Sequence, residues 1–265
     1  MSFAAKKSLG QHFLLNPVTL DKIISLADIG PNDRVLEIGP GPGAMTERIA
    51  ARAGRLVAVE MDRRFAEALK QKFSNDPKVT IVEGDFLSVN LETLLTPDRS
   101  GWKVVSNLPY NIATEILFHL LEFSTFFKSF HMMMQKEVAE RIAAKPGSKT
   151  YGILSVMSQL QSENRIVMKL KPGSFAPPPK VDSAIVQFKI ADGCRFPIHK
   201  LETFEAVVRA AFGQRRKTIA NALKGGGFSP DAIAAALKEA GVAPQARAET
   251  VAIEKFARLA NTFSK

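Results

Sequence analysis

The sequence predicts an α/β fold built on a mostly parallel sheet, followed by a small all-α domain. Three observations support this prediction. Short runs rich in β-branched residues alternate with helical stretches from Asp33 to about Ile190, a pattern typical of a parallel sheet covered by helices. The first of these runs leads into a glycine-rich loop at residues 39–43. From Phe196 onward the hydrophobic pattern is helical throughout.

The expected strands are short and apolar, as buried strands of a parallel sheet are. They lie at Arg34–Ile38, Leu56–Glu60, Val79–Val82, Lys103–Ser106 and His131–Gln135, and a late pair at Arg165–Leu170 and Ser183–Ile190 is expected to form a hairpin-like edge. The helices expected between the strands lie at Ala44–Arg52, Arg63–Phe73, Ala113–Phe123 and Lys136–Ala144. Because residues 132–134, three methionines, fall within the fifth strand, we interpret them as core residues.

The C-terminal part shows clear helix signals. Ser229 is a good N-cap, Pro230 suits the first turn and Gly241 is a stop signal, so we expect a helix over Pro230–Ala240. A final helix is indicated by apolar residues spaced i, i+3, i+4 and i+7, namely Phe256, Leu259, Ala260 and Phe263. We therefore expect residues 1–192 to form the α/β domain and residues 193–265 the helical domain, joined near residues 191–193.

Composition narrows the class of protein. A chain of 265 residues with 46% hydrophobic content can bury a full core. The single cysteine, Cys194, has no partner in the chain, and no Cys/His cluster has zinc spacing, so we expect neither a disulfide nor a metal. Neither a run of about 18 apolar residues nor an apolar signal core is present, which favours a cytoplasmic protein without a membrane segment.

The charge balance suggests a polyanionic partner. The net charge is +10, from 36 Lys and Arg against 26 Asp and Glu, and the pI is about 9.7. Residues 195–265 alone contain 12 Lys and Arg against 6 Asp and Glu. Such concentration in one part of the chain favours nucleic acid binding over a surface that is basic only for solubility.

The glycine loop predicts a nucleotide-like cofactor without identifying it. Gly39, Gly41 and Ala44 fit the dinucleotide-binding spacing, and Glu60 ends the second strand about 20 residues later, where a carboxylate accepts hydrogen bonds from ribose hydroxyls. This pattern leaves both nicotinamide dinucleotides and S-adenosylmethionine open. Glu37, just before the loop, favours the second, because a negative charge suits a sulfonium and repels a pyrophosphate.

Asp85 and Phe86 follow the third strand and add to this hypothesis. They could bind the amine of an adenine and pack against its ring. A turn or a helix cap is an equally good explanation for Asp85.

The segment Asn107–Tyr110 separates the two cofactors. An amide oxygen, a main-chain carbonyl before proline and an aromatic ring at a strand end could hold both hydrogens of an exocyclic amine and aim its lone pair at a methyl group. The alternative is an Asn-led turn with a buried Tyr. In the proline-rich segment Phe175–Ser183, Phe175 could be a stacking platform for a base or a residue that fills the core, and its spacing does not decide between them.

These motifs together resemble a known family. The order and spacing of Gln11–Leu14, the glycine loop, Glu60, Asp85, Asn107–Tyr110, Phe175–Ser183 and Phe212–Thr218 are similar to those of rRNA adenine dimethyltransferases of the KsgA type, from about Lys7 to the end. The glycine loop is shared by many methyltransferases, whereas Asn-Leu-Pro-Tyr narrows the resemblance to adenine amines. The proline-rich segment and the Arg-Arg-Lys run indicate the rRNA branch.

The resemblance implies a Rossmann-like S-adenosylmethionine-dependent methyltransferase domain with a small all-α C-terminal domain. It implies that two methyl groups are placed on the amine of each of two adjacent adenosines near the 3′ end of small-subunit rRNA, in a pre-30S particle, by a monomer. The residues that it assigns to the cofactor are Gly39 and Gly41 (methionine end), Glu60 (ribose), Asp85 (adenine), Gln11, His12 and Leu14 (closing over it) and Asn107 (bordering it). His12 stands where bacterial members commonly have Asn.

The resemblance also assigns residues to the RNA. Asn107, Leu108, Tyr110 and Phe175 hold the target base, and Arg215, Arg216 and Lys217 contact phosphates of the rRNA. Adjacent residues of a helix point in different directions, so we expect at most two of these three cations to touch one phosphate track.

Rival functions remain. One is a large-subunit rRNA adenine methyltransferase of the macrolide-resistance type, and another is a non-catalytic assembly or transcription factor on the same fold. An NAD-dependent oxidoreductase is a weaker third, because the sequence offers no Ser/Tyr/Lys or His/Asp arrangement suited to hydride transfer.

Overall fold

The computed structural model describes residues 11–95, 101–214 and 216–264. The chain divides into two compact units. The first, which we call the sheet unit, contains the chain up to Ala139 and the segment Glu163–Ile190. The second, the helical unit, contains Glu140–Ser162 and the chain from Ala191 onward. Each unit is described by itself below.

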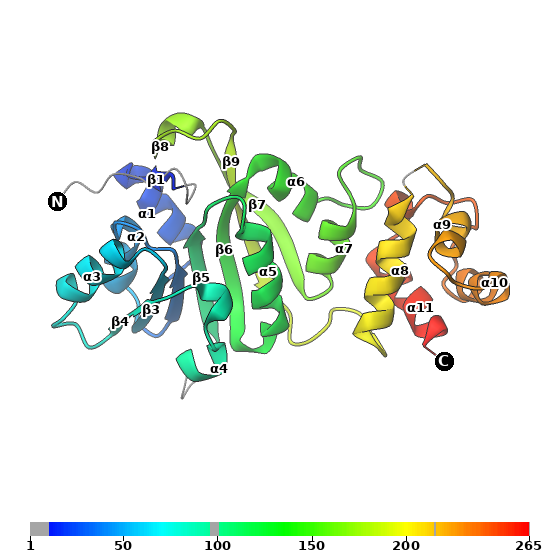
Figure 1. Cartoon of the computed structure of the whole chain (residues 1–265), viewed down its shortest axis with the longest axis horizontal. Helices are drawn as coiled ribbons and strands as arrows, with labels where there is room; N and C mark the ends of the chain where they lie inside the picture. The colour runs from blue at the N-terminus through cyan, green and yellow to red at the C-terminus, as the bar shows by residue number, and fades with distance from the viewer. Residues whose placement is uncertain (1–10, 96–100, 215, 265) are drawn as a thin grey trace. The chain divides into compact units, whose positions relative to one another are not determined.

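The sheet unit is built on a seven-stranded sheet with the order β4-β3-β2-β5-β6-β9-β7 (Figure 1). The strands are β2 (Arg34–Ile38), β3 (Arg55–Glu60), β4 (Val79–Glu83), β5 (Trp102–Asn107), β6 (Phe127–Gln135), β7 (Ser162–Leu170) and β9 (Ser183–Ile190). The pairs from β4 to β6 are parallel, and β9 is antiparallel to β6. All seven strands expected from the sequence are present, and the late pair forms one edge as expected.

Helices cover the sheet between successive strands. They are α1 (Pro17–Leu26), α2 (Ala44–Ala50), α3 (Arg63–Lys72), α4 (Leu91–Leu94) and α5 (Ala113–Glu122). Helix α6 (Lys136–Ile142) follows β6 and contains the point, after Ala139, where the chain passes into the helical unit. From β2 the chain moves toward the β4 edge, whereas from β5 it moves toward the β7 edge. Right-handed crossovers therefore place α2 and α5 on opposite faces of the sheet, with α5 in front in Figure 1.

The core of the sheet unit explains why the strands read as continuous apolar runs. The three methionines at 132–134 are at most 1% exposed, which confirms that they are core residues. Helix α1 was not expected from the sequence, although its start carries ordinary helix signals. The Asn16 side chain caps the helix by accepting a hydrogen bond from the Thr19 amide (3.0 Å), and Pro17 is the first helical residue. It packs through Leu20 and Ile24 into an apolar cluster with residues of α2 and the central strands.

The helical unit has its own apolar core. Its helices are α7 (Ile153–Gln159), α8 (Leu201–Gly213), α9 (Ile219–Gly225), α10 (Pro230–Glu239) and α11 (Ile253–Phe263). The Ser229 hydroxyl accepts a hydrogen bond from the Ala232 amide (3.4 Å), so the expected cap of α10 is present. In α11, Phe256, Leu259 and Ala260 are fully buried, and Phe263 is partly buried against the same core.

The division of the chain differs from the single boundary expected at residue 192. The last crossing between units falls at Ile190–Ala191, close to that boundary, but residues 140–162 also group with the C-terminal helices. Tyr151 and Val156 are buried in the core of the helical unit, and the Tyr151 hydroxyl donates to the Val251 carbonyl (3.1 Å). This grouping depends on contacts about 100 residues apart, which local sequence patterns do not reveal.

In the described ranges no helix is both long and apolar enough to cross a membrane.

Candidate active site at the carboxyl edge of the sheet

The glycine loop and the Asn107–Tyr110 segment lie side by side because β2 and β5 are neighbours. Ile38 is paired with Ser106, so both loops leave the sheet at the same edge. A Cβ atom at Gly39, where φ is +68°, would lie 3.7 Å from the Leu108 side chain. The strand order reverses between β2 and β5, and ligands of open α/β sheets bind at such points.

Two cavities open along this edge, and both are lined by Gln11, Gly39, Glu60, Leu108 and Pro109. The first, about 80 Å³, also reaches His12, Phe13, Leu14, Gly41, Met45 and Asn107. The second, about 180 Å³, also reaches Met61, Asp85, Phe86, Asn111, Ile112 and Ile116. Glu60 lies where they meet, so they form one elongated cleft along the strand ends.

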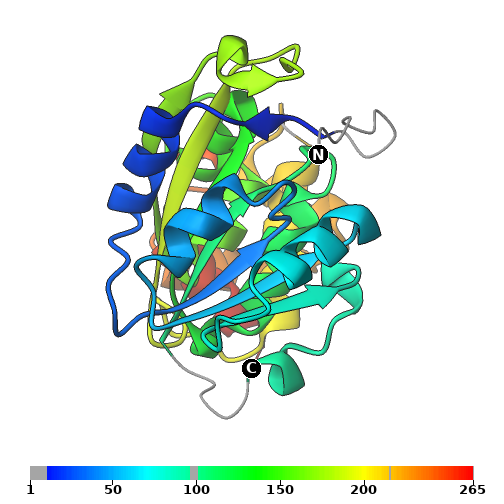
Figure 2. The ribbon, with the colours of Figure 1, turned by 90° about the vertical axis from the view of Figure 1, so that its left-hand side faces the viewer.

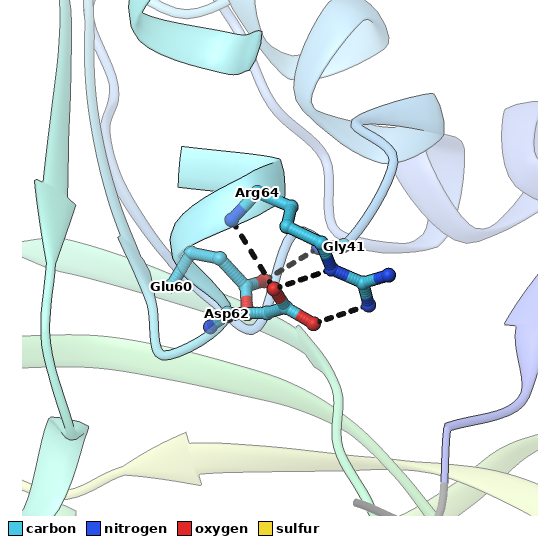
Figure 3. Close-up of polar contacts among 4 residues, drawn as sticks. All are labelled: Gly41, Glu60, Asp62 and Arg64. Atoms are coloured by element: carbon cyan, nitrogen blue, oxygen red, sulfur yellow. Dashed lines mark hydrogen bonds and ion pairs between the residues drawn. The ribbon is translucent and has the colours of Figure 1, made fainter. Parts of the chain in front are cut away.

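Glu60 is held at the centre of this cleft by main-chain donors. Its Oε2 accepts a hydrogen bond from the Gly41 amide (2.8 Å), and its Oε1 accepts one from the Asp62 amide (2.7 Å; Figure 3). Burial raises the pKa of this carboxyl group, and the two main-chain bonds oppose the rise. Each carboxylate oxygen has a second lone pair, so the fixed carboxylate can still accept hydrogen bonds from two ribose hydroxyls.

The turn after Glu60 is fixed by an ion pair. Arg64 donates to Asp62 through Nε (3.0 Å) and Nη2 (2.7 Å), and the Arg64 amide also donates to the same carboxylate (3.2 Å; Figure 3). Asp62 is 4% exposed and caps helix α3. The pair therefore holds the Asp62 amide in place against Glu60.

Gly41 is required by both its conformation and its surroundings. Its φ is +56°, and a Cβ atom there would lie 3.1 Å from the Phe13 ring. Phe13 itself packs edge-on against Phe65 of α3 at 5.5 Å between ring centroids. A side chain at this position would strain the backbone and push Phe13 away from the loop.

Glu37 differs from the expectation of a fixed negative charge. It is fully buried in β2. Among the described residues, neither of its carboxyl oxygens has a partner at normal hydrogen-bond geometry. Burial raises its pKa to about 8; the nearby Thr46 hydroxyl opposes the rise, and the Glu60 carboxylate adds to it. The raised pKa favours the neutral form of Glu37, and a cation bound nearby would favour its ionised form.

Asp85 is a helix cap that also lies at the cleft. Its side chain accepts a hydrogen bond from the Leu87 amide (3.1 Å) and caps the short 3-10 helix Phe86–Ser88. The residue is exposed at the rim of the larger cavity, and the buried Phe86 lines the same cavity. The cap fixes the carboxyl group at the end of the cleft opposite the glycine loop residue Gly41.

The Asn107 amide has a defined orientation. Its Nδ2 donates to the His12 carbonyl (3.2 Å), and a carbonyl can only accept, so Oδ1 is the atom left to accept a bond from a ligand. The Tyr110 hydroxyl is bonded to Ser183 Oγ (2.6 Å), and burial raises the pKa of this hydroxyl. Asn107 and Leu108 line the cleft, whereas Tyr110 lines neither of its two cavities and lies beside it, bonded to Ser183.

Phe175 occupies a different position from that expected of an exposed platform. It belongs to β8 (Phe175–Ala176), which pairs antiparallel with β1 (Phe13–Leu14). The Phe175 side chain is 6% exposed and packs in the same apolar cluster as Leu14. A stacking role for Phe175 would require its ring to be uncovered when a base enters.

The described residues of the basic run, Arg216 and Lys217, lie in the helical unit and in a turn instead of in a helix. Arg216 and Lys217 are exposed between α8 and α9, and Arg215 lies outside the described residues. With Thr218, Asn221 and Lys224 they line an open depression. Helix α8 ends at Gly213 and Thr218 caps α9, so the two cations are not constrained by helical geometry.

Several lining residues were not expected from the sequence. Met61 and Asn111 directly follow the predicted Glu60 and Tyr110, so their place in the chain was a usable signal. Met45 and Ile116 carry no such signal, because an apolar residue on a helix is indistinguishable from an ordinary core residue. Nowhere in the described part of the chain do three or more His, Cys, Asp or Glu side chains form a group that could hold a metal ion.

Comparisons with known proteins agree with this geometry. Residues 2–265 match the family described as ribosomal RNA adenine dimethylase. The ribosomal RNA small subunit methyltransferase A of Geobacter metallireducens is 45% identical over 258 residues, which is 96% of this chain and 94% of that protein.

Two solved structures share the architecture. A dimethyladenosine transferase from Plasmodium falciparum has a TM-score of 0.79 and 26% identity, covering 96% of this chain and 98% of that one. The 23S rRNA methyltransferase ErmE has a TM-score of 0.73 and 30% identity, covering 96% and 100%. The predicted fold class, a methyltransferase α/β domain with a small helical C-terminal part, is confirmed.

The family match spans the cleft, the Asn107–Tyr110 segment and the basic turn alike, and it runs the whole length of the described structure. This chain belongs to the ribosomal RNA adenine dimethylase family.

Proposed function

We propose that this protein dimethylates the N6 amines of two adjacent adenosines near the 3′ end of small-subunit rRNA, with S-adenosylmethionine as methyl donor. The observation that carries the proposal is the position of Asn107, which lines the cleft beside the glycine loop with its Nδ2 bonded to the His12 carbonyl and its Oδ1 left to accept a bond. The relatives named as small subunit methyltransferase A support the choice of substrate.

The residues of the cleft fit the proposed cofactor. Glu60 is fixed to accept hydrogen bonds from the ribose, and Asp85 and Phe86 lie at the end where the adenine would bind. Gly39, Gly41, Gln11, His12 and Leu14 line the end that would hold the methionine part. The buried Glu37 suits a cationic ligand such as a sulfonium. A nicotinamide dinucleotide carries an anionic pyrophosphate and is therefore less suited to this position. When bound, S-adenosylmethionine supplies an electrophilic methyl group.

The protein's own contribution to the chemistry is orientation. An adenine amine is a poor nucleophile because its lone pair is delocalised into the ring. Asn107 Oδ1 and the Leu108 carbonyl would each accept one amine hydrogen, so the lone pair is turned toward the methyl donor. Such orientation supplies several kcal/mol without a strong base. Tyr110 would pack against the ring of the base.

The helical unit supplies the proposed RNA contacts. Arg216, Lys217 and Lys224 are exposed around one depression, and cations so placed suit phosphates of a folded RNA. We propose Arg215 as a further contact. The substrate would then be a pre-30S particle, bound by a monomer of this protein in the cytoplasm.

A second candidate is methylation of large-subunit rRNA, which the structural likeness to ErmE favours. The fold does not separate the two substrates, since both solved structures cover nearly the whole chain. The higher identity to the small-subunit relatives favours the first substrate.

The test is transfer of a radiolabelled methyl group to purified, unmethylated small and large subunits offered separately. We expect label in the small subunit alone. Label confined to the large subunit would establish the second candidate, and absence of label from both would indicate a non-catalytic assembly factor.

A further inference from the structure

His12 contacts the Asn107–Tyr110 loop and the proline-rich segment, the two parts of the sheet unit that would hold the target base. Its Nδ1 lies 2.8 Å from the carbonyl oxygen of Pro177, a residue 165 positions away in the chain. Its ring is stacked on Tyr110, with 5.8 Å between centroids and 22° between planes. Its own carbonyl accepts the bond from Asn107. The N-terminal segment and the β8 segment lie side by side in both views of the ribbon (Figures 1 and 2).

The hydrogen bond to Pro177 fixes the form of the imidazole. A carbonyl oxygen carries no hydrogen, so Nδ1 must be the donor and must hold a proton. The bond joins the N-terminal segment to the start of the proline-rich segment. His12 and Pro177 directly adjoin Phe13 and Ala176, which are paired in the β1–β8 ladder. The side-chain bond of His12 therefore adds one contact at the end of that ladder.

The second contact fixes Tyr110. Its ring is covered on one side by His12, and its hydroxyl is bonded to Ser183, the first residue of β9. Pro177 lies in the first half of the proline-rich segment and Ser183 is its last residue, so His12 and Tyr110 together tie two points of that segment to the Asn107–Tyr110 loop.

We propose that His12 is a positioning residue of the target-base pocket. Its side chain holds Tyr110 and the proline-rich segment in register, and its main-chain carbonyl orients the Asn107 amide. This inference rests on the proposed function, and it gives His12 a different role from the cofactor contact that the family resemblance implies. The role follows from three contacts to base-binding elements, all within the sheet unit.

Three substitutions separate the two side-chain contacts. His12→Phe keeps an aromatic ring for Tyr110 and loses the donor to Pro177. His12→Asn keeps a donor and loses the ring. His12→Ala loses both while leaving the main-chain carbonyl that orients Asn107. His199, exposed in the helical unit, provides the matched histidine control as His199→Ala.

The experiment measures single-turnover methyl transfer to saturating unmethylated small subunits, the Kd for S-adenosylmethionine by calorimetry, and Tm. For His12→Ala we expect a transfer rate about tenfold to thirtyfold lower than that of the wild-type protein, because one hydrogen bond and one ring contact are lost. We expect the cofactor Kd and Tm to stay close to the values for His199→Ala. The Phe and Asn variants should each retain part of the rate.

Three results would overturn the inference. Transfer by His12→Ala at the wild-type rate would show that the contacts position nothing. Cofactor affinity that falls in parallel with the rate would return His12 to the cofactor, and Tm that falls with it in all three variants would make the contacts purely structural. Wild-type protein that methylates neither subunit would instead refute the proposed function, so the two failures are distinguishable.

Discussion

The cleft of the sheet unit and the basic turn of the helical unit are built in opposite ways. The cleft is assembled from segments far apart in the chain, and its polar groups are fixed by hydrogen bonds such as that between Glu60 and Gly41. The basic turn consists of consecutive exposed cations that make no use of distant segments. Chemistry that depends on orientation requires the first kind of site, whereas attraction to phosphates requires only the second.

Among substitutions that test this comparison, we expect Asn107→Ala to have the largest effect, on the rate of methyl transfer. Asn107→Ala removes an acceptor that acts on the reacting amine, so the transfer rate should fall by about a hundredfold to a thousandfold. Binding of the small subunit should be nearly unchanged, because the basic turn is intact. Single-turnover rates and subunit binding, measured on the same preparation, check this. A wild-type rate would remove Asn107 from the mechanism.

Phe175→Ala tests whether burial or base stacking dominates at that residue. Its ring is packed in the apolar cluster of the sheet unit, so its removal should lower the free energy of unfolding by about 3 kcal/mol. Denaturant unfolding measures this loss. Unchanged stability, together with weaker capture of the RNA, would show that the ring acts as a platform and contributes little to the core.

Glu60→Ala should weaken S-adenosylmethionine binding by about 2–3 kcal/mol, because two charge-assisted hydrogen bonds to the ribose are lost. Glu83→Ala is a matched control: Glu83 is paired with Glu60 in the β3–β4 register and forms a surface ion pair with Lys70 (3.7 Å). Calorimetry should show normal affinity for the control. Tight NADH binding by the wild-type protein would contradict the cofactor assignment.

The basic turn should respond to salt, unlike the cleft. Replacing Arg215, Arg216 and Lys217 with Ala should remove about two phosphate contacts and flatten the slope of log affinity against log salt by roughly 1.5–2 units. Cofactor affinity should not change. Lys238→Ala, an exposed cation on α10, is the control. An unchanged salt slope in the triple variant would place RNA recognition elsewhere.

Glu37 should make ligand binding depend on pH. A carboxyl pKa raised to about 8 destabilises the folded state as pH rises from the ordinary value of the group toward 8, so Tm should decrease over that window. Glu37→Gln should lose this part of the pH dependence. Calorimetry at pH 7 in buffers of different ionisation enthalpy should detect release of up to one proton when S-adenosylmethionine binds. The same measurement without proton release would show that Glu37 is already ionised.

The sequence was sufficient for the parts of the molecule set by local patterns. All seven strands of the large sheet followed from apolar runs, and helix α10 followed from its cap and stop signals. Glu60 and Asn107 were predictable because strand ends of a parallel sheet meet at one edge. The structure brings both to the same cleft.

Features that depend on distant contacts were not predictable. The bond of His12 to Pro177 and the pairing of β1 with β8 require the complete fold. The raised pKa of Glu37 depends on complete burial, which the position of the residue beside a glycine loop does not reveal. The grouping of residues 140–162 with the helical unit also depends on a distant contact, because the Tyr151 hydroxyl is bonded to the Val251 carbonyl.

The most direct test of the central claim is to map the methylated bases after reaction of the wild-type protein with unmethylated small subunits. Mass spectrometry of nuclease fragments should find two adjacent adenosines near the 3′ end of the rRNA, each carrying two methyl groups on N6, and Asn107→Ala should leave both unmodified. Methyl groups on a single isolated adenosine, on another base, or only in the large subunit would contradict the account.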